Sequence, residues 1–291
     1  MRRTAFVLLI PALCFAGFTS LKILPGVREA GMGNTGVASG EGPQAMVWNP
    51  ASSILTEGFQ LRVSYAKWLL DTHHSSLFLV RNLGFVRLGV GAVAFSAGRF
   101  EHRAEVPLEE PLGYFTPVDM TAHLNVARSF GGVVSLGVSG RYYYSKILEH
   151  QANSIGLDAG MRLVPLRGLV LGVSVADFSR NPAYHRETFR MPFRARAGAS
   201  YELRLGGEFG LQFAGEGSYF ILSERFTGQG GIELGWAETL FLRTGYEWLH
   251  TRSRFGFGLG LALGRFSFDY ALTPLNDNLG LAHRVSVGLG R

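Results

Sequence analysis

Apolar residues recur at every second position over many stretches of the chain. Between positions 255 and 263, for example, Phe255, Phe257, Leu259, Leu261 and Leu263 alternate with small residues. Side chains of a β-strand point alternately to the two faces of a sheet, so this pattern predicts strands that are apolar on one face only. About fourteen strands are predicted, approximately at 59–68, 74–82, 85–96, 120–130, 133–145, 153–164, 168–178, 193–204, 208–217, 226–236, 239–249, 254–263, 265–272 and 283–290.

The connectors between these strands alternate in length. Asn82–Gly84, Phe130–Gly132 and Leu205–Gly207 are tight turns, whereas Gly98–Asp119, Phe178–Pro192 and Gly217–Phe226 are longer and polar. Transmembrane β-barrels have short periplasmic turns and long outer loops, and a bacterial single-chain barrel has an even number of strands. The pattern therefore predicts an all-β fold, a transmembrane antiparallel barrel of about fourteen strands whose long loops lie outside the cell.

The polar faces of the predicted strands carry charges of both signs. In a barrel they line the lumen, where the planar guanidinium of arginine can pair with carboxylates. A soluble sandwich would instead place this face outside, but such exteriors are richer in lysine, and this chain has only Lys22, Lys67 and Lys146. The predicted luminal charges are Arg62, Asp158, Arg162, Arg194, Arg196, Glu202, Glu208, Glu216, Glu233, Arg243, Glu247, Asp269 and Arg284.

Aromatic residues cluster near the predicted strand ends. With the chain entering the first strand from the periplasmic side, most of them fall near the outer rim and a few near the inner rim. Amphipathic rings favour both interfaces of a membrane, so these residues predict two aromatic girdles, although aromatic residues are also good strand formers. The outer set is Tyr142, Tyr144, Phe193, Trp248, Phe255 and Tyr270, and the inner set is Trp236 and Phe266.

Residues 1–16 have the pattern of a secretory signal peptide. Arg2 and Arg3 precede an apolar stretch, and Cys14-Phe15-Ala16 offers small residues at a cleavage site. The stretch is too short for a transmembrane helix. Because Cys14 is the chain's one cysteine, the exported protein is expected to contain no disulfide and no cysteine-based site.

Composition agrees with a membrane barrel. Of the 291 residues, 47% are hydrophobic, 17% are charged and 39 are glycine, whereas soluble domains carry about 25% charged residues. Removal of Arg2 and Arg3 lowers the formal net charge from +6 to +4. No basic run is present, so a nucleic-acid partner is not expected. The expected partners are outer-membrane lipid, a hydrophobic small molecule or a secreted protein, with no cofactor and no metal, and the chain is expected to be monomeric.

Residues 17–57 precede the first predicted strand and lack the alternating pattern. This segment is rich in glycine and has one short helix-like stretch, Gln44–Trp48. Its apolar side chains, Met32 and Trp48 among them, would be costly to expose to water. We therefore expect a hatch that starts on the periplasmic side and packs inside the barrel formed by residues 58–291. Its glycines would allow the backbone to approach the wall closely.

The same segment carries a recognisable motif. The block Gly26-Val27-Arg28-Glu29-Ala30-Gly31-Met32-Gly33, followed by Trp48-Asn49-Pro50-Ala51, resembles the N-terminal signature of PorV/PorQ-like proteins, a branch of the FadL-type outer-membrane barrels. The closing strands, with Phe268–Leu272 and His283–Val287, are similar to the end of that family. The resemblance implies a fourteen-strand barrel, a luminal N-terminal hatch and no enzymatic activity.

Candidate site residues lie mainly in this motif: Arg28, Gly31, Met32, Gly33, Trp48, Asn49 and Pro50. Arg28 is expected either to bind a luminal carboxylate or to remain solvated. Asn49-Pro50 is expected to end a helix, because proline disfavours helix at the preceding residue, and a ligand contact by Asn49 is the alternative. His73-His74 lacks a spaced acidic partner for a metal. His74 and Ser75 would face opposite ways in a strand, so no hydrolase is expected.

Two functions from different classes remain. The first is passive, energy-independent passage or binding of a hydrophobic small molecule in a FadL/PorV-type barrel, gated by the N-terminal segment. The second is a component of a secretion or surface-assembly system of the PorV type, with a purely structural barrel as a third alternative. The stretch from Pro107 to Phe115 is the part of the loops that suggests a protein partner.

Overall fold

The computed structural model describes residues 18–69, 71–103, 110–184, 187–248, 253–275 and 279–290. The predicted signal peptide, Cys14 and part of the stretch from Pro107 to Phe115 lie outside these ranges. No helix in the described part of the chain is long and apolar enough to cross a membrane.

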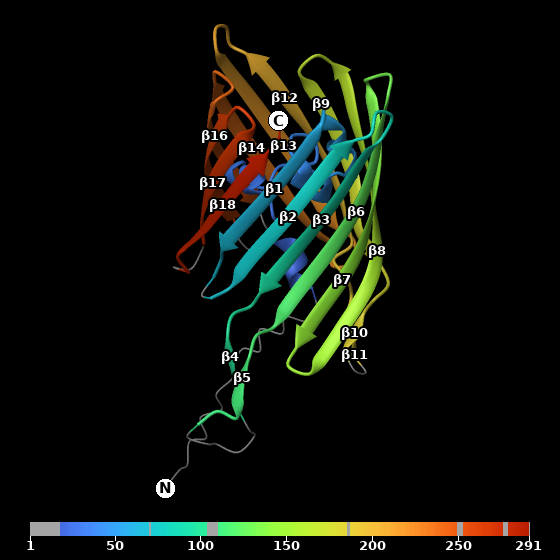
Figure 1. Ribbon diagram of the computed structural model, residues 1–291, viewed down its shortest axis with the longest axis vertical. Helices are drawn as coiled ribbons and strands as arrows, with labels where there is room; N and C mark the ends of the chain where they lie inside the picture. Colours follow the sequence, from blue (N-terminus) through green and yellow to red (C-terminus); the bar gives the residue numbers. More distant parts are fainter. Residues whose placement is uncertain are drawn as a thin grey trace.

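Fourteen antiparallel strands close into one barrel, in which strands adjacent in sequence pair and β1 pairs with β18 to complete the ring. Figure 1 shows the cylinder with its strands tilted from the long axis. This confirms the prediction of a fourteen-strand barrel. The barrel strands are β1 (Phe59–Lys67), β2 (His73–Asn82), β3 (Arg87–Ser96), β6 (Val118–Phe130), β7 (Val134–Ile147), β8 (His150–Leu166), β9 (Leu169–Ser179), β12 (Arg194–Arg204), β13 (Phe209–Phe220), β14 (Arg225–Trp236), β15 (Leu240–Trp248), β16 (Ser253–Leu263), β17 (Phe266–Pro274) and β18 (Leu281–Leu289).

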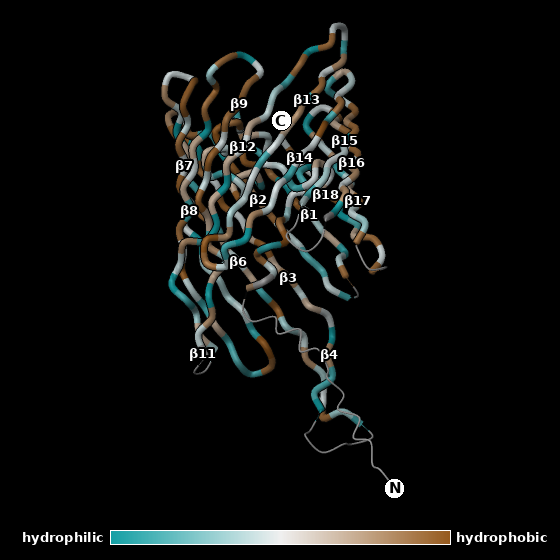
Figure 2. Tube along the Cα trace, turned by 180° about the vertical axis from the view of Figure 1, so that it is seen from behind, coloured by the Kyte–Doolittle hydropathy of each residue, from teal (hydrophilic) through white to brown (hydrophobic). Residues whose placement is uncertain are grey.

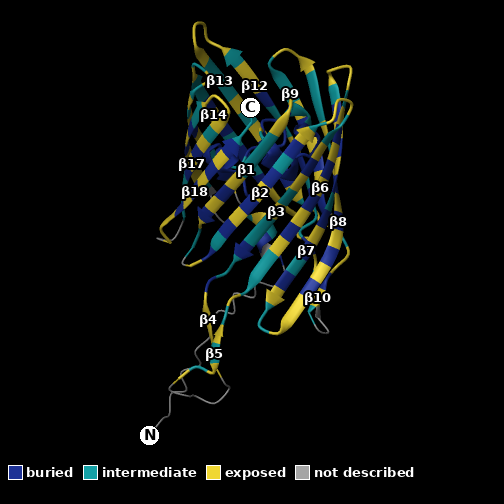
Figure 3. Cartoon of the chain, viewed as in Figure 1, coloured by how far each residue is buried: buried dark blue, intermediate teal, exposed yellow. Residues whose placement is uncertain are grey.

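Burial follows the alternation in the sequence. Along β18, Val285 and Val287 are about half exposed, at 47% and 48%. Arg284 and Ser286, which alternate with them, are each 3% exposed. The striped strands in Figure 3 and the brown positions along the tube in Figure 2 repeat this pattern around the barrel. The apolar face is therefore the outside, as lipid contact requires, and the polar face lines a filled lumen.

The two ends of the barrel differ in their connectors. Tight turns lie at the end where the C-terminus lies, and two small two-stranded arms extend from the other end (Figure 1). One arm is β4 (Phe100–His102) with β5 (Gly113–Phe115), and the other is β10 (Ala183–Tyr184) with β11 (Glu187–Thr188). We refer to these as the short-turn end and the long-loop end.

Not every connector at the long-loop end is long. The predicted loop Gly217–Phe226 is mostly strand, because β13 continues to Phe220 and β14 begins at Arg225. Leu148 and Glu149 alone join β7 to β8, and Leu148 has a φ of 55°. The alternation continues through both hairpins, so the polar residues there extend the strands instead of ending them.

A β-bulge interrupts the pairing of β8 with β9. Leu157 pairs with Phe178 and Ala159 with Val175, so the single residue Asp158 lies opposite both Ala176 and Asp177. Asp177 has a φ of 64°, and its backbone N–H donates to Asp158 Oδ1 at 2.8 Å. The extra residue turns two successive side chains inward, and both are at most 1% exposed.

The segment before β1 lies inside the barrel. It contains three 3₁₀ helices, η1 (Thr19–Lys22), η2 (Pro43–Val47) and η3 (Pro50–Leu55), and one short helix, α1 (Val27–Gly31). The prediction of a luminal N-terminal segment is confirmed, but the expectation that it starts at the short-turn end is wrong. Phe18 packs against Tyr143 and Met191 near the long-loop end, so the segment passes through the lumen before it enters β1. We call its described residues, 18–57, the hatch.

Candidate functional site in the barrel lumen

Arg28 joins the hatch to the wall through a buried ion pair. It lies in α1 and is 3% exposed. Its Nε and Nη2 donate to the two carboxylate oxygens of Glu233 at 3.0 and 2.8 Å. Nη1 donates to the carbonyl of Ser39 at 2.7 Å, and Nη2 also donates to Gln212 Oε1 at 2.7 Å. The guanidinium therefore has partners on all sides, which favours one orientation of the hatch.

The pair is one end of a chain of alternating charges. Glu233 on β14 also accepts from Arg243 Nε on the facing β15. Arg243 Nη1 in turn donates to Asp269 on β17 at 2.7 Å, and Asp269 accepts from Arg62 on β1. Arg28, Glu233, Arg243, Asp269 and Arg62 thus alternate in sign, so each buried charge has a counter-charge and the desolvation cost is partly offset.

Glycines of the wall allow the hatch backbone to lie directly against the strands. A Cβ added to Gly245 or Gly231 would overlap the backbone of Met32, and one added to Gly33 would overlap the backbone of β14 and β15. Gly33 also has a φ of 68°, a conformation that other residues rarely adopt. At Gly31, an added Cβ would lie 2.9 Å from the Cα of Gly258. The contact therefore depends on glycine on both surfaces.

Trp48, Asn49 and Pro50 form the centre of the hatch. Trp48 is fully buried, and its indole N–H donates to the carbonyl of Asn34 at 3.1 Å. Asn49 is the N-cap residue of η3, and its Oδ1 accepts from Ala51 N at 3.0 Å. Its Nδ2 donates to the carbonyls of Val37 and Met161 at 2.8 and 2.9 Å. Asn49 therefore uses its amide to join two parts of the hatch to β8, while Pro50 occupies the first position of η3.

A second charge cluster lies toward the long-loop end, around the bulge. Arg141 pairs with Asp158 and with Asp177 Oδ1, the latter at 2.8 Å. Arg194 contacts Asp177 Oδ2 at 3.0 Å, and Tyr143 donates to Asp177 Oδ1 at 3.0 Å. Two arginines balance two aspartates. The cluster also reaches the hatch, because Arg194 donates to the carbonyl of Leu21 at 3.1 Å.

Other wall residues bind the hatch backbone directly. Glu216 Oε2 accepts from the N–H groups of Gly36 and Val37 at 2.6 and 2.8 Å. Arg196 donates to the carbonyls of Val47 and Trp48 at 3.1 and 3.2 Å. These contacts satisfy backbone groups that the irregular hatch cannot pair internally.

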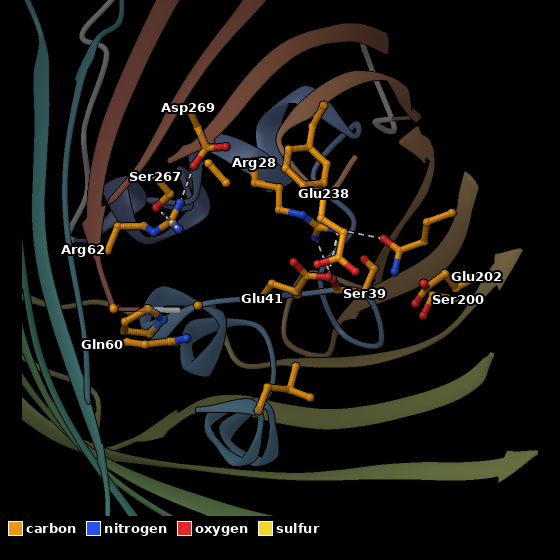
Figure 4. A pocket seen from close by; sticks show the side chains of 18 of the residues that line it. Arg28, Ser39, Glu41, Gln60, Arg62, Ser200, Glu202, Glu238, Ser267 and Asp269 are labelled. Atoms are coloured by element: carbon orange, nitrogen blue, oxygen red, sulfur yellow. Dashed lines mark hydrogen bonds and ion pairs between the residues drawn. The ribbon is translucent and has the colours of Figure 1, made fainter. Parts of the chain in front are cut away.

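A polar cavity of ≈ 840 Å³ opens on the short-turn side of the hatch. Hatch residues such as Ser39 and Glu41 form one side, and strand residues such as Arg62 and Glu202 form the other, as Figure 4 shows. Its lining mixes arginines with carboxylates, so water would fill it. We call it the inner chamber.

A second cavity, of ≈ 520 Å³, lies on the long-loop side. We call it the outer chamber, and its lining shares no residue with that of the inner chamber. Its apolar lining residues are Ile23, Leu24, Trp68, Leu69, Phe220, Leu275 and Leu279, and its cations are Lys22, Arg194, Arg196, Arg225 and Arg254. Burial, with Arg225 and Arg194 nearby, lowers the pKa of Lys22. Glu216 and Glu247 also line this chamber, so cations are in excess. The hatch therefore separates a polar chamber from one that combines apolar residues with an excess of positive charge.

Most of the predicted luminal charges do point inward. Asp158, Arg194, Arg196, Glu216, Glu233, Arg243, Glu247, Asp269 and Arg284 are buried, and Arg62, Arg162 and Glu202 line the inner chamber. Glu208 does not belong to this set. It lies exposed in the turn between β12 and β13, because β13 begins one residue later than the alternation suggested.

Arg141, Tyr143 and Asp177 were not among the predicted luminal residues. Arg141 and Tyr143 occupy inward positions of β7, where the alternation could have identified them. The signal for Asp177 is a slip in the pattern: Val175 and Phe178 both face outward, at 40% and 62% exposure, although strict alternation would place them on opposite faces. Such a slip indicates an inserted residue.

His73 and His74 lie on opposite faces of β2. His74 is buried in the lumen, whereas His73 on the outer face is partly exposed and Ser75 on the same face is exposed. Within the described ranges, no three His, Cys, Asp or Glu side chains gather in a way that could hold a metal ion.

Several solved structures have a fold similar to that of this chain. The CymD monoaromatic hydrocarbon channel aligns over 92% of this chain and 98% of its own, with a TM-score of 0.66 and 14% identity. The Ralstonia pickettii toluene transporter TbuX covers 91% and 96%, with a TM-score of 0.63 and 14% identity. A Pseudomonas aeruginosa FadL homologue covers 91% and 98%, with a TM-score of 0.58 and 12% identity. The chain has the fold of the FadL-type outer-membrane barrels. No protein-family model and no curated protein sequence matches the chain.

Proposed function

We propose that this protein is an outer-membrane barrel that passes a hydrophobic small molecule without an energy source, with the hatch as its gate. The observation that carries this proposal is the pair of chambers on either side of the hatch, of which the outer one has apolar residues in its wall. The solved structures of similar fold include a monoaromatic hydrocarbon channel and toluene transporters. A small aromatic hydrocarbon is therefore the first substrate to test.

In this proposal the long-loop end faces the cell exterior, and the leader sequence of residues 1–16 directs export. The substrate enters the outer chamber, the hatch moves, and the substrate leaves through the inner chamber. The many polar contacts of the hatch favour a small displacement over release of the whole segment, because each buried group that loses its partner costs free energy. The chain acts as a monomer and catalyses no reaction.

A reversible crosslink tests the gate. Asn34 in the hatch donates to Glu247 on β15 at 2.8 Å, so cysteines at both positions can be joined by a short bis-methanethiosulfonate, which forms a reducible disulfide with each thiol. Since Cys14 is the chain's one cysteine and lies in the predicted leader, no other thiol of the exported protein competes. The double variant is reconstituted in vesicles, and entry of labelled toluene is measured.

We expect the crosslink to slow toluene entry and a reductant to restore it. The two single-cysteine variants, treated in the same way, should keep the parent rate. Unchanged entry in the crosslinked protein would show that the hatch is not the gate. Entry no faster through the parent than through empty vesicles would contradict passage of a hydrocarbon altogether.

The arm of β4 and β5 favours a second candidate, a secretion or surface-assembly component related to the PorV/PorQ-like proteins. Leu112 and Tyr114 of this arm are 59% and 54% exposed, and the arm extends beyond the barrel (Figure 1). Exposed apolar residues on such an arm suit a protein partner. Removal of residues 100–115 should then abolish surface delivery of a secreted protein and leave toluene entry intact. The reverse result favours the channel.

A further inference from the structure

The outward face of the barrel carries one basic row at its long-loop end. Lys67, the last residue of β1, pairs in register with His73 of β2 on one side and with His283 of β18 on the other. Lys67 and His283 are exposed and His73 is partly exposed. Neighbouring strands are about 4.8 Å apart, so the three side chains span roughly 10 Å. We call these three residues the basic row.

Each histidine of the row is paired with a tyrosine on the same outer face. The hydroxyl of Tyr65 lies 2.6 Å from His73 Nδ1, and the hydroxyl of Tyr270 lies 2.8 Å from His283 Nδ1. The Tyr65 and His73 rings also stack, with centroids 5.6 Å apart. With the tyrosine hydroxyl donating to Nδ1 in both pairs, Nε2 of each ring carries the proton and can donate to a partner outside the protein. The same pair thus occurs twice, once on either side of Lys67.

The row lies at the border of the apolar band. The next outward positions along the strands are Tyr65, Ser75 and Val285, and the ones after them are Val63, Leu77 and Val287, which are 49%, 48% and 48% exposed. The described outward positions of β17, β18, β1, β2 and β3 contain no carboxylate. Lys67 therefore has no acidic neighbour among these described strand positions, and its ammonium lies at the end of the apolar band, where lipid headgroups meet the hydrocarbon layer.

We propose that the basic row binds the phosphate group of an outer-leaflet glycolipid of the lipid A type. Three hydrogen-bond donors in line match the acceptor oxygens of a phosphate, and the apolar outward positions further along the same strands match its acyl chains. The two aromatic rings hold the imidazoles in place before the lipid arrives. This inference rests on the proposed orientation in the outer membrane, but not on the passage of a substrate.

The test measures lipid binding to the purified full barrel in detergent, by native mass spectrometry against a titration of diphosphoryl lipid A. Lys67→Gln is compared with Lys146→Gln, an exposed lysine of β7 whose paired neighbours are Val118 and Gln151. Both changes remove one outward charge at the long-loop end. A combined variant, with Gln at positions 67, 73 and 283, removes the whole row. Heat-modified mobility on gels confirms that each variant is folded.

We expect Lys67→Gln to weaken binding about tenfold, as expected for loss of one charge-assisted contact. The combined variant should weaken it further, and Lys146→Gln should change it less than about twofold. Lys67→Arg should retain binding, and inorganic phosphate should not compete, because it lacks the acyl chains. Dephosphorylated lipid A should bind parent and variants alike.

Equal binding of diphosphoryl lipid A by the parent and the combined variant would overturn the proposal. So would a preference of the parent for phosphatidylglycerol over diphosphoryl lipid A. Toluene entry through Lys67→Gln vesicles should equal that of the parent, since the row faces lipid and not the lumen. A parent that binds lipid A but passes no toluene would count against the channel alone, so the two proposals fail separately.

Discussion

The Arg28–Glu233 pair offers a direct test of how the hatch is held. Glu233→Gln keeps the size of the side chain and removes its charge. Arg28 and Arg243 then both face a neutral amide within the wall. The side chains of the two arginines are each 4% exposed, and that of Glu233 is 10% exposed. Breaking a buried ion pair costs about 3–5 kcal/mol. Arg28 keeps Gln212 and Ser39, and Arg243 keeps Asp269, so we expect about 3 kcal/mol, the lower end of that range.

Two comparisons sharpen this prediction. Arg28→Met should cost less, about 1–2 kcal/mol, because Glu233 keeps Arg243 as its counter-charge. Glu202→Gln is the matched control: this carboxylate is also luminal, but it is exposed to the inner chamber, and its loss should cost under about 0.5 kcal/mol. Urea unfolding in lipid vesicles, followed by tryptophan fluorescence, measures all three.

A conductance measurement shows whether loss of the ion pair loosens the hatch. In planar bilayers the parent should conduct little, since the hatch fills the lumen, and Glu233→Gln should show bursts of current as the hatch loosens. A Glu233→Gln protein that unfolds at the same urea concentration as Glu202→Gln, and conducts no more, would refute the idea that this pair anchors the hatch.

The other predictions concern the lipid face, the wall of the lumen and the orientation. Leu259→Arg should cost about 2–4 kcal/mol in vesicle folding, because Leu259 is 54% exposed on the lipid face; folding equal to the parent would mean that this position does not face lipid. Gly245→Ala should raise bilayer conductance, because the added methyl group would overlap Met32; unchanged conductance would indicate that the wall can yield. Trypsin added to intact cells should cut at Arg99 and Arg180 in the long loops, and cleavage only after the outer membrane is opened would reverse the orientation.

Much of the barrel could be predicted from the sequence. The predicted strand 74–82 is His73–Asn82 in the structure, and the strand 254–263 is Ser253–Leu263. The reason is local. A strand between lipid and a polar lumen must alternate apolar and polar residues, so the polarity of each residue indicates which face its side chain occupies. The alternation failed at two places. At Asp177 a bulge shifts it by one residue, and at Gly217–Phe226 glycine and polar residues continue a hairpin instead of forming a loop.

The site was predicted as a set of residues, not as an arrangement. The sequence alone determined that the segment before the first strand is too apolar for water and that inward positions carry paired charges. Only the tertiary structure decided that this segment begins near the long-loop end, and that Arg28 meets Glu233, 205 residues further along the chain. Such partners depend on how the closed ring brings distant strands around one lumen, and no local pattern encodes that distance. The basic row arises in the same way, since β1 and β18 become neighbours only when the barrel closes.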